Sequence, residues 1–210
     1  ALAKAQENSI SVNPGTMRKA KEYLTRYLSR FSANDYESKA VVLHALSQSN
    51  DADYAKANRI YRNRNSLSTT ELAYTALTFV NLNRMPVAKE LAELLSAKIK
   101  KIDPESHEPL GYFPHEVNQY RLQNNLQTTG LALMLFSHTH PDNSNGHAAA
   151  RWLLHRRGTY PYRAGTARGP ILAGLSAWYT QGKENRSDFR VTVIVNGEEL
   201  ATITSDQLKR

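Results

Sequence analysis

Apolar residues recur at intervals of three and four along most of the chain, which is the spacing of one face of a helix. The first stripe covers residues 17–31 and follows an Asn-Pro-Gly-Thr turn, in which Thr16 is the expected N-cap. Ser68 and Glu71 have the spacing of a capping box, and Pro86 is tolerated in the first turn of another helix. The pattern predicts helices over residues 17–31, 36–48, 52–63, 69–82, 86–99, 126–138, 145–157 and 166–181.

Two segments depart from helical spacing. Residues 100–125 are polar and aromatic with three prolines, and they are predicted to form a long loop of the kind that often carries function. Residues 189–195 and 199–204 alternate and are rich in β-branched residues, and the Asn-Gly pair between them is typical of a β-hairpin. We therefore predict a helical domain over 1–184 and, over 185–210, a β-hairpin segment that belongs to a following β domain.

Every second predicted helix is apolar almost all round. These helices contain ESKAVVLHAL, TELAYTALTFV, QTTGLALMLF and RGPILAGLSAWY, and corresponding positions lie 34, 56 and 41 residues apart. Two-faced helices alternate with them, so the chain consists of helical hairpins. The alternation predicts a mainly α protein, an α/α toroid in which apolar inner helices are covered by amphipathic outer ones. Small residues, Gly130 and Gly174 among them, would let the inner helices approach closely.

The composition of the chain argues against a membrane-spanning protein, a nucleic-acid-binding protein and thiol-dependent chemistry. The 210 residues are 40% hydrophobic and 22% charged, with a net charge of +8, and no apolar run is long enough to span a membrane. The basic clusters are short, and none interleaves aromatic residues along a strand as single-strand nucleic-acid sites do, so nucleic acid is not favoured as a partner. The sequence has no cysteine, which excludes disulfides and thiolate chemistry within these residues. The opening ALAKAQENSI is expected to be a mature terminus or a cut through a longer chain.

The predicted loop holds the candidate catalytic side chains, which are His115, Glu116, Tyr120 and Arg121. Such groups could serve a polysaccharide lyase or a glycosidase at the mouth of a helical ring. Against that alternative, the inner helices supply almost no acid beyond Glu37 and Glu71, and helix-terminal positions explain both. No pattern for a cofactor or a metal is present, since the histidines near residue 140 have no suitably spaced acidic partner.

The last part of the helical region resembles a known family. Residues 148–179, AAARWLLHRRGTYPYRAGTARGPILAGLSAWY, followed by FRVTVIVNG, are similar to the end of the thioester-containing domain of α2-macroglobulins and complement proteins. That family has a pattern close to A-x-R-W-L-x-x-Q-R, then a Gly-aromatic turn, then S-T-Q-D-T-x-x-A-L-x-A-L-x-x-Y and the strands of a β domain. QTTGLALMLF resembles its E-x-T-A-Y-x-L-L-A-L helix. Ala167 and Arg168 stand where the family has Gln-Asp.

The resemblance implies an α/α toroid, complete or partial, and a non-enzymatic role in trapping proteases. The expected partners are a target protease and other domains of the parent chain, and the implied location is periplasmic, cell-surface or secreted. The family acts through a Cys–Gln thioester in a C-G-E-Q motif, which this sequence lacks. Either the motif lies upstream of Ala1, or the protein belongs to a thioester-free branch. In complement-type domains a loop histidine attacks the thioester, and His115 lies in a comparable stretch.

Overall fold

The computed structural model describes residues 2–102, 109–116, 125–157, 165–181, 190–195 and 198–204. Helices account for most of these residues, and two short antiparallel sheets complete them. The helices are α1 (Leu2–Glu7), α2 (Pro14–Leu28), α3 (Tyr36–Ser47), α4 (Tyr54–Tyr61), α5 (Thr69–Asn81), α6 (Met85–Ser96), α7 (Asn125–Thr139), α8 (Ser144–His155) and α9 (Gly165–Gln181), with a 3-10 turn at Arg64–Ser66. The strands are β1 (Lys100–Ile102), β2 (Leu110–Tyr112), β3 (Arg190–Val195) and β4 (Glu198–Thr204).

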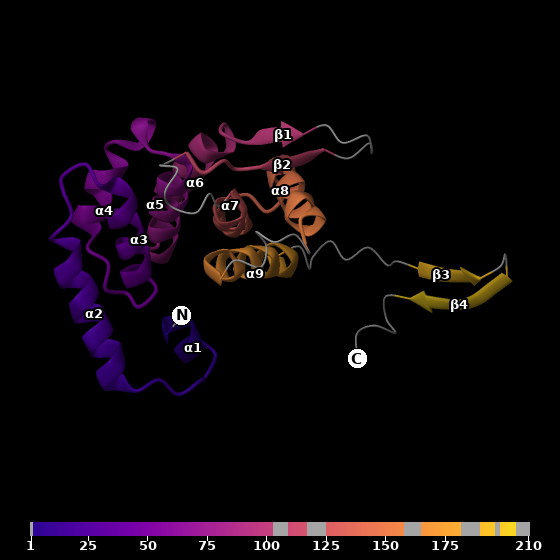
Figure 1. The fold of residues 1–210 in the computed structure, drawn as a ribbon, viewed down its shortest axis with the longest axis horizontal. Helices are drawn as coiled ribbons and strands as arrows, with labels where there is room; N and C mark the ends of the chain where they lie inside the picture. Colours follow the sequence, from indigo (N-terminus) through magenta and orange to yellow (C-terminus); the bar gives the residue numbers. More distant parts are fainter. Residues whose placement is uncertain are drawn as a thin grey trace.

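The predicted alternation of inner and outer helices is confirmed. The inner helices α3, α5, α7 and α9 pack one on the next in chain order, as Figure 1 shows across the molecule. The outer helices α4, α6 and α8 each pack on the adjoining inner helices. In α7, the helix that contains QTTGLALMLF, all residues from Thr128 to Leu133 are buried, whereas α6 buries a stripe of Ala88, Leu91, Ala92 and Leu95. The architecture is a mainly α, helical-hairpin toroid.

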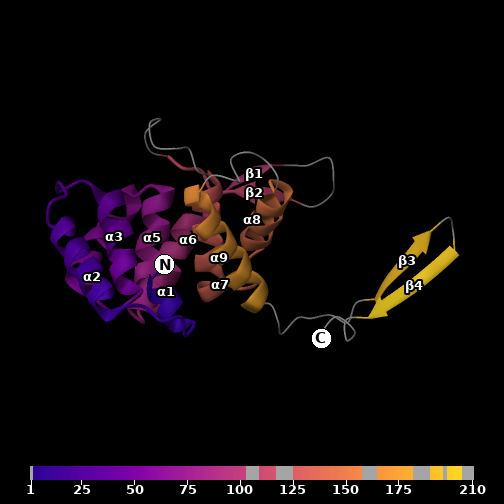
Figure 2. The ribbon, with the colours of Figure 1, turned by 60° about the horizontal axis from the view of Figure 1, so that its bottom comes forward.

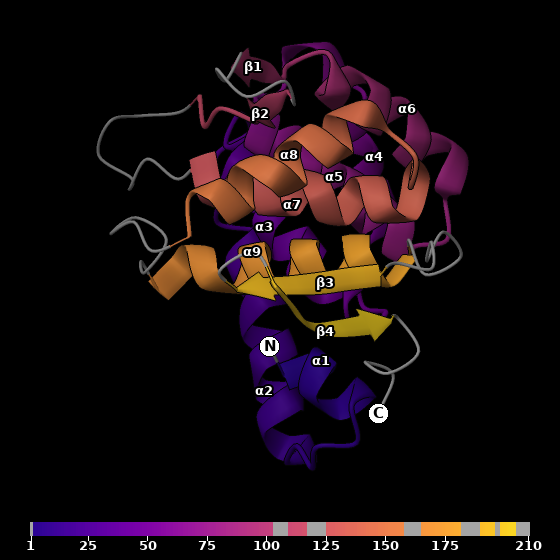
Figure 3. The same ribbon diagram turned by 90° about the vertical axis from the view of Figure 1, so that its right-hand side faces the viewer.

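Two glycines allow α7 and α9 to pack backbone against backbone, in the arrangement that Figure 3 shows from the side. A Cβ added to Gly174 would lie 2.3 Å from the carbonyl oxygen of Gly130, and one added to Gly130 would lie 2.6 Å from the carbonyl carbon and oxygen of Pro170. No real Cβ is found so close to backbone. Glycine is therefore required at both positions by the close approach of the two helices.

The described inner helices form an arc that is open between its ends, because α3 and α9 are not packed on each other as successive inner helices are. As the last member, α9 buries Ala167, Ile171 and Trp178 but leaves Leu172 64% and Tyr179 56% exposed. The expectation that amphipathic outer helices cover the inner ones is met less fully at α9, which packs mainly on α7. Short α1 lies near the inside of the arc and contains no buried residue (Figure 2).

The expectation of an unbroken loop over 100–125 is wrong. Lys100–Ile102 and Leu110–Tyr112 form an antiparallel pair, in which Lys101 faces Gly111. Strand β2 packs on α8, and the Tyr112 ring stacks on Trp152 with centroids 5.1 Å apart. These strands are three residues long, and contacts with distant helices stabilise them, so no local period marks them in the sequence.

The helix ends follow the expected capping with one exception. Ser68 and Glu71 form both hydrogen bonds of the capping box at the start of α5. The cap of α2 is Asn13, not Thr16, because the Asn13 side chain accepts hydrogen bonds from the backbone of Gly15 and Thr16. The helix then begins at Pro14, three residues before the apolar stripe.

The predicted C-terminal hairpin is present as β3 and β4, which pair antiparallel with a register irregularity at Val193/Ile194. Figures 1 and 2 show it set apart from the helices. The Asn196–Gly197 turn and the expected domain boundary at 184/185 lie outside the described residues, so the division into two domains stays a prediction.

Candidate functional site

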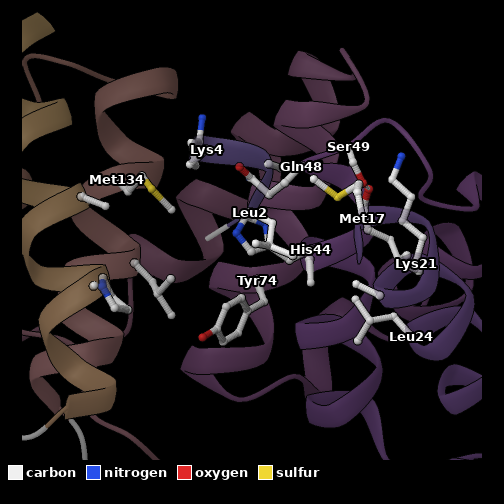
Figure 4. A pocket seen from close by; sticks show the side chains of 18 residues that line it. Leu2, Lys4, Met17, Lys21, Leu24, His44, Gln48, Ser49, Tyr74 and Met134 are labelled. Carbon is white, nitrogen blue, oxygen red and sulfur yellow. Dashed lines mark hydrogen bonds between the residues drawn. The ribbon is translucent and has the colours of Figure 1, made fainter. Parts of the chain in front are cut away.

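Two places on the inner helices bring polar side chains together. One is a cluster at the N-terminal ends of α5 and α7, which we call the rim cluster, formed by Thr69, Thr70, His115, Glu116 and Thr128. The other is a cavity inside the arc, which we call the hub cavity, lined by residues from the inner helices together with α1 and α2 (Figure 4).

The rim cluster contains two of the four predicted site residues. The Thr70 hydroxyl lies 2.9 Å from Nδ1 of His115 and 3.1 Å from the Thr128 hydroxyl. The backbone N–H of His115 donates to Oδ1 of Asn125 at 2.9 Å. His115 is thus held by α5 and by the start of α7, more firmly than an ordinary loop histidine. Tyr120 and Arg121 lie outside the described residues.

Glu116 acts as a helix cap across a large sequence separation. Its Oε2 accepts a hydrogen bond from the Thr69 backbone N–H at 3.1 Å and lies 3.3 Å from Nζ of Lys98. A carboxylate at this position is favoured by the partial positive charge of the α5 N-terminus. The Glu116 carboxylate therefore joins the 113–116 segment to α5, and Lys98 neutralises part of its charge.

The rim cluster is tied into the core beneath it. The Phe113 backbone N–H donates to Oγ1 of Thr129 at 3.0 Å, and the fully buried Phe113 ring lies 5.6 Å from that of Phe136. Thr70 and Thr128 are buried, so neither hydroxyl is open to a substrate. The rim cluster therefore has a structural role, because it connects the inner helices α5 and α7. A paired-carboxylate site is not formed by the described rim residues, since Glu71 and Glu116 both serve as helix caps.

The hub cavity has a volume of about 510 Å³ and mainly apolar walls. The walls include Leu2, Met17, Leu24, Leu131 and Met134, with the polar side chains of His44 and Tyr74 between them (Figure 4). The charged residues among those lining it are Lys4 and Lys21, and no Asp or Glu from the described chain is among them. Such a cavity offers no carboxylate for acid or base chemistry on a sugar.

Burial shifts the pKa values of His44 and Tyr74 in the hub cavity. The pKa of His44 is lowered to about 4, because burial disfavours the imidazolium and nearby Lys4 adds repulsion. Protein atoms cover most of the His44 ring, and the part of its surface that stays accessible faces the cavity. Burial also raises the pKa of Tyr74, whose hydroxyl accepts a hydrogen bond from Nε2 of Gln127 at 2.9 Å. At neutral pH both groups are uncharged.

The hub residues were not among the predicted site residues, although the sequence contains a signal for them. His44 interrupts the apolar run AVVLHAL of an inner helix, and an imidazole among such neighbours faces either another helix or a cavity. Tyr74 meets the His44 ring with centroids 5.5 Å apart. The two residues are far apart in the sequence, so their contact could not be predicted before the packing of α3 on α5 was known.

Within the described residues, no cluster of three or more His, Asp or Glu side chains has an arrangement that could hold a metal ion. No described helix is long and apolar enough to cross a membrane.

The sequence comparisons give no relative for this chain. No protein-family profile matches it, and no curated protein matches it. Comparison with solved structures does find matches. The crystal structure of Salmonella α2-macroglobulin reacted with methylamine aligns with 98% of this chain at a TM-score of 0.67 and 15% identity. The chain has an α2-macroglobulin-like fold.

A second solved structure agrees. Native Escherichia coli α2-macroglobulin, spanning domain MG7 to the C-terminus, aligns with 99% of this chain at a TM-score of 0.60 and 16% identity. The chain spans 13% of the Salmonella chain and 33% of the Escherichia coli chain. The similarity to α2-macroglobulins inferred from the residues of α7 to β3 is thus confirmed at the level of fold.

Proposed function

We propose that this chain is the helical-toroid domain of an α2-macroglobulin-like protease-trapping protein, and that it acts through protein–protein contacts without enzymatic activity. The observation that carries the proposal is the hub cavity, whose lining includes no carboxylate from the described chain, within an α2-macroglobulin-like fold. A glycosidase acts through a pair of carboxylates, and the described residues that line the hub cavity supply none. The proposed partners are the target protease and other domains of the parent protein.

His115 and Glu116 have structural roles under this proposal. They fasten the 109–116 segment to α5 and α7 through Thr70 and the Thr69 backbone. No thioester can form within this chain, because it contains no cysteine. A trap that relies on conformational capture needs the toroid as a rigid body that moves with its neighbouring domains. The proposed location is periplasmic, cell-surface or secreted, where a trap would meet foreign proteases.

The test uses the complete protein that carries this segment, mixed with a protease of broad specificity. We expect the protease to keep its activity on a short chromogenic peptide and to lose its activity on a large protein such as casein, because enclosure excludes only large substrates. A Gly174→Ala variant, which disturbs the α7–α9 contact, should trap less protease than a Gly169→Ala variant, in which nothing lies within 4 Å of the added Cβ. If the protease cleaved casein as fast in the presence of the protein as in its absence, with its activity on the peptide also unchanged, the trapping proposal would be wrong.

A panel of polyanionic and neutral glycans, incubated with the same protein, tests the enzymatic alternative. Release of unsaturated or reducing sugar that disappears on replacement of His115 and Glu116 would favour a lyase or glycosidase. We expect no product.

A further inference from the structure

A groove outside the hub and the rim cluster has the character of a binding site. It is formed by the C-terminal end of α2, the connection to α3, and parts of α3 and α4, and we call it the α2–α4 groove. Its volume of about 400 Å³ lies in the range of ligand-binding clefts. Leu28, Leu43 and Ile60 are almost fully buried and line it, and Phe31 and Tyr36 are its partly buried aromatic members.

Positive charge surrounds this apolar floor. The charged residues that line the groove are Lys39, Lys56 and Arg59, and none of its lining residues in the described chain is acidic. Nζ of Lys39 donates to the Ala33 carbonyl at 2.7 Å, which leaves its charge without a carboxylate partner there. Arg59 is exposed, and within the described structure its guanidinium forms no ion pair or hydrogen bond with another side chain.

The acidic residues at the starts of α3 and α4 hydrogen-bond to the helix backbone and form no ion pair with Lys39 or Arg59 in the described structure. Asp35 accepts a hydrogen bond from the Ser38 backbone at 3.1 Å. Asp53 accepts from the backbone of Ala55 at 2.8 Å, and its other carboxylate oxygen lies 3.5 Å from Nζ of Lys56. Only Lys56 of the three cations therefore has a carboxylate nearby, at the long end of ion-pair distances and largely exposed to water.

We propose that the α2–α4 groove binds an acidic segment of a partner protein, which inserts one large apolar side chain over Leu28, Leu43 and Ile60. Carboxylates on either side of that anchor pair with Lys39, Lys56 and Arg59. Arginine is suited to this role, because its guanidinium binds a carboxylate through two parallel hydrogen bonds. The floor is aliphatic, and the aromatic members Phe31 and Tyr36 are partly buried, so the groove suits an apolar side chain better than a nucleic-acid base, which stacks on exposed aromatic faces. The proposal does not depend on protease trapping.

The experiment selects binders to the 210-residue chain from a phage-displayed library of random peptides of about twelve residues, long enough for one anchor and its flanking charges. We expect the selected peptides to combine Asp or Glu with a Phe, Leu or Trp. The best peptide is then synthesised, labelled and titrated against the wild-type chain and two variants, Arg59→Glu and Arg62→Glu. Arg62 is the C-cap residue directly after α4, is exposed, and does not line the groove, so it is the matched control.

The expected result is a loss of affinity of about tenfold or more for Arg59→Glu and a small change for Arg62→Glu, because a buried or close charge pair contributes far more than a remote one. Replacing the apolar anchor of the peptide by Ser should weaken binding similarly. Unchanged thermal unfolding of both variants shows that the effect is local. The proposal would be overturned if no peptide were selected, or if the selected peptides had no carboxylates. It would also be overturned if the peptide bound Arg59→Glu as tightly as the wild type. A labelled single-stranded oligonucleotide that displaces the peptide would reassign the groove to nucleic acid.

Discussion

Two histidines of this protein show how position decides the role of the same side chain. His115 accepts or donates a hydrogen bond with the Thr70 hydroxyl at the rim, and its backbone is bonded to Asn125. His44 lies at the hub, where Nδ1 has no hydrogen-bond partner within the described structure. Burial and Lys4 together keep His44 neutral down to acidic pH. His44 therefore links the packing of the hub to the stability of the fold in acid.

The pH dependence of stability follows from His44. Its pKa falls from 6.5 to about 4 on folding, so between these values the unfolded chain binds a proton that the folded chain does not. The free energy of unfolding should therefore fall as the pH is lowered from about 6.5 to about 4, by at most about 3 kcal/mol from this residue. Above about pH 6.5 His44 should have no effect on the slope.

Urea unfolding of the wild type and of His44→Gln at several pH values measures this contribution. The variant should lose less stability than the wild type on acidification, while the values near neutral pH report the packing cost of the substitution alone. Some slope should remain, because burial and Lys4 also lower the pKa of His138, although its side chain is partly exposed. Parallel curves for the two proteins would show that the His44 pKa is not lowered by folding.

At the scale of elements, the inner helices are held by close contact more than by polar bonds. Helix α7 is buried on nearly all sides, and it contacts α5, α6, α8, α9 and β2. The contact with α9 depends on Gly130 and Gly174, where the two backbones meet. Pro170 lies inside α9, and its backbone, with that of Ile171, is close to the Cβ position of Gly130.

Substitution of the glycines tests this contact. Gly174→Ala should destabilise the protein by about 1–3 kcal/mol, because its Cβ would meet backbone that cannot move aside without shifting a helix. Gly169→Ala is the matched control on the same helix, since nothing lies within 4 Å of its Cβ. Alanine there should be neutral or stabilise by up to about 1 kcal/mol through helix propensity. Denaturant midpoints measure both; similar losses for the two variants would show that the glycines do not mediate the helix contact.

Most of the helices could be predicted, because apolar residues at helical spacing and caps such as Ser68–Glu71 are local signals. The inner helices were recognisable because QTTGLALMLF and its counterparts have few charged residues and no polar face. The β1–β2 pair was missed, since its strands are short and depend on α8. The short α1 was also missed, because it has neither a buried face nor a capping signal.

The candidate site was predictable only in part. His115 and Glu116 were selected for their chemistry, but their contacts with Thr70 and Thr69 join residues about 45 positions apart. Such contacts are set by how the 109–116 segment crosses the ends of α5 and α7. Tyr120 and Arg121 stay predictions, because they lie outside the described residues.

At the scale of the whole molecule, the described helices form an arc whose last inner helix, α9, keeps an exposed apolar side at Leu172 and Tyr179. The chain covers a small part of the α2-macroglobulin chains that share its fold. The distribution of stability should follow the same geometry. Inner helices with neighbours on both sides should unfold only when the whole protein unfolds. Helix α1, with no buried residue, should unfold locally.

Hydrogen–deuterium exchange of the backbone amides tests the inner-helix arrangement most directly. We expect the slowest exchange in α5 and the 128–136 part of α7, near the rate set by global unfolding, because these residues are buried between helices. Amides of α1 should exchange many times faster, and those on the exposed sides of α6 and α8 should be intermediate. If residues 128–136 exchanged as fast as α1, then α7 would not lie at the centre of the protein, and the account of an apolar hub would be contradicted.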